Sequence, residues 1–141
     1  MRIVLATALL LAATPSPARE PPAALKLPEL PPGSNERLRT GLTSSPDLEV
    51  IVSDVVIAPG EQVPRHYHPG EEFLYLVEGS AVHIEHGAPD RPLRPGDALV
   101  IKPGAVHSPR AGSAGARAIV FRVHVKGQPE RIPVPAAPAP R

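Results

Sequence analysis

Histidine is the residue type in this sequence whose spacing carries chemistry. His66 and His68 are two residues apart, and Glu72 follows four residues later. Residues two apart on a strand face the same side, with Cα atoms about 6.6 Å apart, so both imidazoles can reach one ion. His107 follows the Pro103-Gly104 turn on a separate stretch of chain. These four side chains are therefore candidate ligands of a single metal.

The donor set restricts which metals the site can hold. Histidine nitrogen and carboxylate oxygen are present, and the chain has no cysteine. Such a set suits Fe(II), Mn(II), Ni(II), Cu(II) or Zn(II) without choosing among them, so we predict one divalent transition metal. In the alternative interpretation, core hydrogen bonds satisfy these side chains and no metal binds. A buried carboxylate among imidazoles costs several kcal/mol unless something compensates its charge, which favours the metal.

The remaining polar candidates carry weaker signals. His83 and His124 alternate with apolar neighbours and are predicted to face solvent, whereas His86 stands at the end of a strand. Glu71 is predicted to point away from Glu72, either exposed or behind the metal ligands.

Short runs rich in β-branched residues must position these side chains. The 21 prolines and 11 glycines break long helices, and turns such as Pro59-Gly60 and Pro95-Gly96 separate the runs. The predicted strands are 37–42, 48–58, 73–77, 81–85, 97–101 and 118–125. Strands at this spacing predict an all-β protein, an antiparallel sandwich or barrel.

Two stretches of this pattern resemble the signatures of the cupin superfamily. Residues 60–79 read Gly-x5-His-x-His-x3-Glu-x6-Gly, which matches the first signature position for position. Residues 96–107, GDALVIKPGAVH, resemble the second signature. They differ from it in carrying Lys102 where the family has proline, and Ala111 replaces the closing asparagine. Both differences lie outside the ligand set.

The resemblance implies a single antiparallel jelly-roll barrel whose metal ligands are His66, His68, Glu72 and His107. It also implies an enzyme similar to the quercetin-dioxygenase-like cupins, acting on a small metal-chelating organic substrate. In that interpretation Glu72 is also catalytic, releasing the metal to act as a base. Related cupins carry out dioxygenation, decarboxylation, isomerisation and lyase reactions, and small cupins often form homodimers.

Two other functions are compatible with the sequence. One is a non-catalytic periplasmic module that binds a metal or small ligand, since no acid or base beyond the metal ligands is compelling. The other is a metal-free cupin similar to sugar-nucleotide epimerases, which would keep its activity in a chelator. The complete ligand set argues against the latter.

Composition sets the boundaries and excludes one class of partner. Residues 1–18 have the layout of a signal peptide, 19–35 form a proline-rich disordered leader, 36–126 form the domain, and 127–141 form a proline-rich tail. The 15 basic and 14 acidic residues include no run of like charge, and the chain has only four aromatic residues. Both observations argue against a protein that binds nucleic acid. We expect a periplasmic or secreted protein that does not associate with a membrane after signal cleavage.

Overall fold

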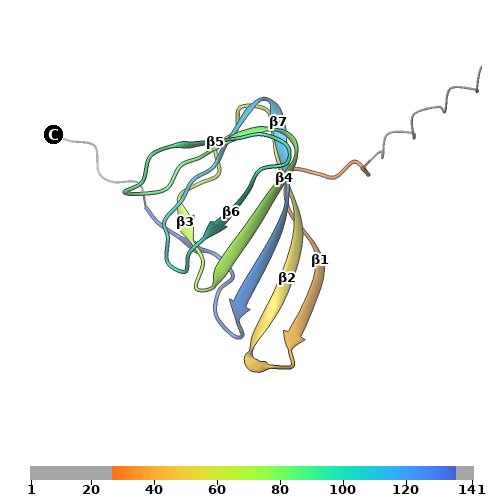
Figure 1. Ribbon diagram of the computed structural model, residues 1–141, viewed down its shortest axis with the longest axis vertical. Coiled ribbons are helices and arrows are strands. Elements are labelled where there is room, and N and C mark those ends of the chain that lie inside the picture. Colours follow the sequence, from red (N-terminus) through yellow and green to blue (C-terminus); the bar gives the residue numbers. More distant parts are fainter. Residues whose placement is uncertain (1–26, 136–141) are drawn as a thin grey trace, which may run out of the picture.

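The computed structural model describes residues 27–135. The predicted signal peptide 1–18, the first part of the leader and residues 136–141 lie outside this range. The described chain is all-β, as predicted, and its strands pair antiparallel (Figure 1). The strands are β1 Gly33–Leu42, β2 Ser45–Ile57, β3 His66–Tyr67, β4 Glu71–His83, β5 Arg91–Leu93, β6 Ala98–Ile101, β7 Arg110–Val125 and β8 Ile132–Pro133. Within residues 27–135 no helical segment has the length and apolarity that a membrane crossing requires.

One large sheet contains most of the strands. Its order is β1-β2-β7-β4-β5, and β6 also pairs with β4. Long β-branched runs explain β2 and β7, whose register pairs Leu48 with Val125 and Ile57 with Ala116 without interruption. Figure 1 shows these strands side by side, with β1 at one edge.

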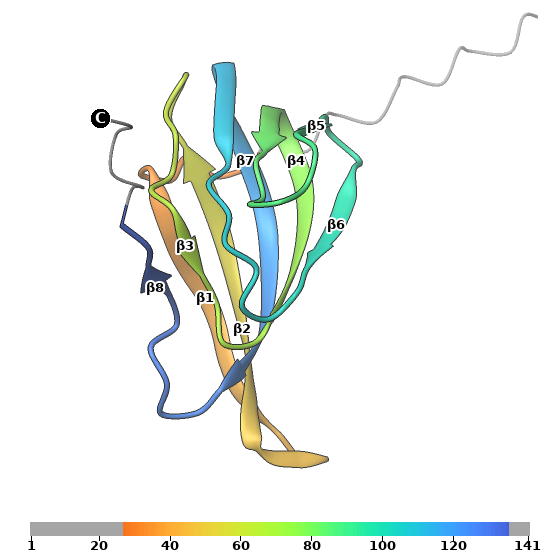
Figure 2. The ribbon, with the colours of Figure 1, turned by 90° about the vertical axis from the view of Figure 1, so that its left-hand side faces the viewer.

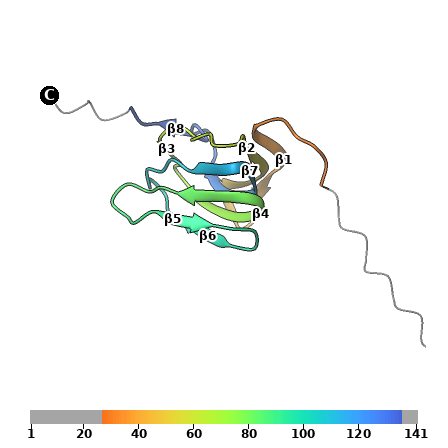
Figure 3. The ribbon, with the colours of Figure 1, turned by 90° about the horizontal axis from the view of Figure 1, so that it is seen from above.

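A facing layer of short segments completes the fold. β3 pairs with β8, and residues 106–108 lie between β3 and residues 84–86 (Figure 2). His66 and His107 exchange both backbone hydrogen bonds, at 3.0 and 2.8 Å, and the amide of Ser108 donates to Ile84 at 2.9 Å. In the view from above, β3 and β8 lie on the opposite side of the molecule from β5 and β6 (Figure 3). The space between the two layers holds the core and the candidate site.

An irregularity in β4 changes which residues face the core. Glu72 and Leu76 point inward, but the register with β7 shifts between Leu76 and Ala81, so that Ala81 and His83 point inward instead. Gly79 makes this bend, because its φ is +73° and a Cβ there would lie 2.1 Å from the carbonyl oxygen of Gly115. The predicted solvent exposure of His83 is therefore wrong. The prediction placed the apolar residues on either side of His83 toward the core, and they are only partly buried.

β7 directs its larger apolar side chains outward. From Ala118 through Val120 to His124 its buried positions have even numbers, whereas Phe121 is 45% exposed. His124 is 3% exposed and lies 3.1 Å, through Nε2, from the carbonyl oxygen of Gln128. The predicted exposure of His124 is also wrong. The prediction assumed that the valines beside it face the core, and they lie on the outer face.

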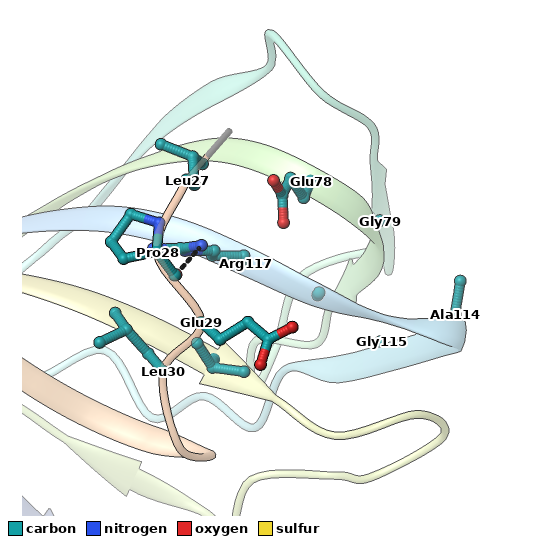
Figure 4. A pocket seen from close by; sticks show the side chains of 11 residues that line it. Leu27, Pro28, Glu29, Leu30, Glu78, Gly79, Ala114, Gly115 and Arg117 are labelled. Atoms are coloured by element: carbon teal, nitrogen blue, oxygen red, sulfur yellow. Dashed lines mark hydrogen bonds between the residues drawn. The ribbon is translucent and has the colours of Figure 1, made fainter. Parts of the chain in front are cut away.

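Ordered chain extends beyond both predicted ends of the domain. β1 begins at Gly33, and β8 lies within the predicted tail. On the amino-terminal side Arg117 donates to the carbonyl oxygen of Pro28 at 2.9 Å and forms a buried ion pair with Asp54 at 2.7 Å. A surface pocket of 360 Å³ lies beside residues 27–30 (Figure 4). No histidine lines it.

Candidate metal centre

The structure brings three of the four predicted ligands together. His66, His68 and His107 each offer a nitrogen, and these nitrogens lie within 4.8 Å of one another. Their ring centroids are 4.2 to 5.4 Å apart, and each residue is at most 5% exposed. β3 supplies His66, the turn after it supplies His68, and the backbone pairing within the facing layer brings His107 beside them. Three nitrogen donors from two parts of the chain thus converge in the interior.

Backbone carbonyl groups fix the tautomer of all three rings. In each ring Nδ1 lies within hydrogen-bonding distance of a carbonyl oxygen: Pro64 for His66 (2.7 Å), Glu130 for His68 (2.5 Å) and Ala105 for His107 (2.9 Å). A carbonyl oxygen only accepts, so Nδ1 carries the proton and donates. The lone pair of a neutral ring is then on Nε2, which is how metal-binding histidines are usually oriented.

Burial keeps two of these rings neutral. It lowers the pKa of His66 to about 3, with a further contribution from the nearby His107. Burial also lowers the pKa of His107. Both rings therefore offer a lone pair near neutral pH, so a metal does not have to displace a proton from them.

Glu72, the fourth predicted ligand, lies beside the three histidines but does not join the group within 4.8 Å. Its Oε2 accepts a hydrogen bond from Arg122 Nε at 2.7 Å, and both side chains are under 10% exposed. Glu72 on β4 and Arg122 on β7 form a cross-strand pair. Burial acts to raise the pKa of Glu72, but His68 and Arg122 outweigh it and lower the pKa to about 2. Glu72 is therefore a carboxylate shared between the site and a buried arginine.

The contact between His68 and Glu72 is compatible with a bound cation. Nε2 of His68 is buried without a hydrogen-bond partner among residues 27–135, and Glu72 Oε2 lies 3.1 Å from it. Two acceptors that face each other repel unless a cation or a proton lies between them. Adjacent ligands of an octahedral metal with bonds of about 2.1 Å are about 3.0 Å apart. The observed separation suits such a pair of ligands.

Gly70 permits the close approach of this region to β7. A Cβ at Gly70 would lie 1.7 Å from the carbonyl oxygen of Val123, so no larger residue fits without moving the backbone. The turn containing Gly70 connects His68 to Glu72 and allows both side chains to reach the interior.

Two of the three histidines, His66 and His107, line an internal cavity of 70 Å³ between the layers. Its polar lining residues are His66, Glu72, His83 and His107, and the rest of the lining is apolar. Pockets for drug-sized ligands usually measure about 300–1,000 Å³. In this conformation the cavity suits only a small ligand.

Sequence reasoning missed three residues of this region. Arg122 lies among apolar residues of β7. The one signal available in the sequence was that Arg122 and His124 are two residues apart and therefore face the same side of the strand. Glu130 lies in the predicted tail, yet it accepts from His68 through its carbonyl and from Arg122 through its side chain at 2.9 Å. His83 was assigned to the wrong face. Glu71 is exposed, in agreement with one of its two predicted positions.

Comparison with known proteins identifies the family. Residues 53–124, about half of the chain, match the family model of the cupin domain. The chain is a cupin. This confirms the resemblance of the two signatures and the jelly-roll expectation. The tetracenomycin polyketide synthase protein TcmJ of Streptomyces glaucescens is 36% identical to this cupin over 99 residues. The match covers 62% of this chain and 64% of TcmJ, so this cupin spans less than two thirds of that relative.

Solved structures share the fold of this cupin. DMSP lyase DddQ from Ruegeria pomeroyi is 28% identical, with a TM-score of 0.51 over 60% of this chain and 42% of that chain. The polyketide cyclase RemF from Streptomyces resistomycificus has a TM-score of 0.55 over 76% of this chain and 77% of RemF. RemF is 22% identical, so its similarity concerns the fold alone.

Proposed function

We propose that this protein is an exported, metal-dependent cupin enzyme that acts on a small organic molecule. The observation that carries the proposal is the convergence of three histidines whose Nδ1 protons are held by backbone carbonyls. A bound divalent metal would supply Lewis acidity and anchor an oxygen atom of the substrate. His66, His68 and His107 would hold it, with Glu72 beside them.

The relatives support an enzyme without selecting its reaction. TcmJ is named as a polyketide synthase protein and DddQ as a lyase. Our more specific proposal is dioxygenase-like chemistry on a metal-chelating substrate. The size of the cavity favours a small substrate and also gives the non-catalytic ligand-binding module its best support.

The test of this proposal is an activity screen with separate metals. Protein loaded with Fe(II), Mn(II), Ni(II), Cu(II) or Zn(II) is incubated with phenolic, dicarbonyl and organic-acid substrates, while oxygen uptake and product masses are measured. We expect at least one substrate to be converted and the conversion to stop in EDTA and in His107→Ala. Stable metal loading without conversion of any substrate would favour the binding module.

We also propose that a second copy of this cupin covers the outer face of the large sheet. Five large apolar side chains are 39–54% exposed: Leu38, Phe73, Tyr75, Val100 and Phe121. Phe73 pairs across strands with both Val100 and Phe121, so these three form a continuous patch. Contiguous apolar patches of several hundred Å² usually mark an interface.

Light scattering after size exclusion tests the dimer. Wild-type protein is expected to elute at twice the mass of the chain, and Phe121→Asp to elute as a monomer, because burying an unpaired carboxylate is costly. Ala88→Asp places the same charge on an exposed loop and should remain dimeric. A monomeric wild type, or a dimeric Phe121→Asp, would contradict this assignment.

A further inference from the structure

His83 is the polar residue of the cavity that the metal site leaves unused. It is 6% exposed and lines the cavity together with His66, Glu72 and His107. Its ring centroid is 5.6 Å from that of His107, at an interplanar angle of 33°. It does not belong to the group of three converging nitrogens. Its position therefore calls for a different role.

The hydrogen bond of His83 gives its ring the opposite orientation to the three candidate ligands. Its Nε2 lies 3.2 Å from Glu85 Oε2, and Glu85 reaches the surface with its side chain 33% exposed. A carboxylate only accepts, so Nε2 carries the proton. In a neutral ring the lone pair is then on Nδ1, for which residues 27–135 provide no hydrogen bond.

The surroundings of His83 favour a ligand as the missing partner. The wall of the cavity contains apolar side chains such as Leu74, Leu93 and Val120, which cannot donate a hydrogen bond. Ala81, Ala116 and Ala118 also line the cavity, and their small side chains leave the space open. An acceptor in an apolar enclosure gains more from a ligand donor than it would in water.

We propose that His83 positions the ligand of the metal centre by accepting, at Nδ1, a hydrogen bond from a ligand hydroxyl group. This inference rests on the proposed function. It narrows the ligand class to small molecules that carry both a metal-binding oxygen group and a free O–H. Glu85 acts through His83 by holding its proton on Nε2.

Two matched probes and two matched variants test this role. Glycolate and methoxyacetate both carry a carboxylate. In methoxyacetate a methyl group replaces the hydroxyl hydrogen of glycolate, so only glycolate can donate a hydrogen bond from this oxygen. Their affinities for Zn(II)-loaded protein are measured by calorimetry, and zinc content is measured on the same samples. His83→Asn places an amide oxygen near the position of Nδ1, whereas His83→Gln places its polar group near Nε2. His86→Gln, at an exposed position, is the control.

We expect wild type, His83→Asn and His86→Gln to prefer glycolate by about tenfold, which corresponds to one hydrogen bond. His83→Gln should bind zinc normally and bind both probes equally. Wild type that holds zinc but shows no preference, or His83→Gln that keeps the preference, would overturn the role of His83 alone. Absence of zinc from wild type would overturn the proposed function and this inference with it.

Discussion

Replacing His66 with alanine is expected to reduce the metal content of the protein from about one equivalent to less than about a tenth. His66 supplies one of three converging nitrogens, and its burial keeps that nitrogen unprotonated near neutral pH. Two remaining imidazoles hold a divalent ion much more weakly than three. Elemental analysis after removal of free metal measures this change.

The same variant should lose the stabilisation that metal gives. A ligand present at 100 times its Kd adds about 2.7 kcal/mol to the free energy of unfolding. For a domain of this size that corresponds to a rise in Tm of roughly 10 °C or more. We expect zinc to raise the Tm of wild type by this amount and to leave that of His66→Ala unchanged.

His86→Ala is the matched control, because His86 is exposed and stands outside the cluster. It should match wild type in both measurements. Equal metal loading in wild type, His66→Ala and His86→Ala would contradict the assignment of the metal site to the three histidines. Equal Tm increases in all three would show that the metal acts elsewhere on the chain.

Residue spacing was sufficient to predict the converging histidines. His66 and His68 face the same side wherever the chain is extended. The turn before His107 is consistent with His107 lying on a segment beside them. The all-β fold followed from β-branched runs between Gly and Pro turns. Both inferences rest on local geometry, which the sequence determines directly.

What the sequence did not reveal depends on packing between distant segments. The inward position of His83 results from the bulge at Gly79, which reverses the alternation along β4. The tail residue Glu130 reaches His68 because β8 pairs with β3. The pairing of Arg122 with Glu72 follows from the register between β7 and β4. None of these contacts has a signature in neighbouring residues.

Replacing Arg122 with methionine is expected to destabilise the metal-free protein strongly. Arg122 and Glu72 are 9% and 6% exposed, and the change leaves the Glu72 carboxylate buried without its cation. Breaking one side of a buried ion pair costs about 3–5 kcal/mol. The loss in free energy of unfolding should be largest in EDTA, because a metal held by the histidines would compensate the charge of Glu72. Urea unfolding with EDTA and with zinc measures both values.

Two further variants show whether Glu72 responds to the metal. Glu72→Gln combined with Arg122→Met removes the unpaired charge and should recover most of the stability lost in EDTA. Arg39→Met breaks an exposed network that also contacts Glu130, and it should cost no more than about 1 kcal/mol. If Arg122→Met loses the same free energy of unfolding with and without zinc, the bound ion does not compensate the charge of Glu72. In that case Glu72 is a structural partner of Arg122, and the metal ligands are the three histidines.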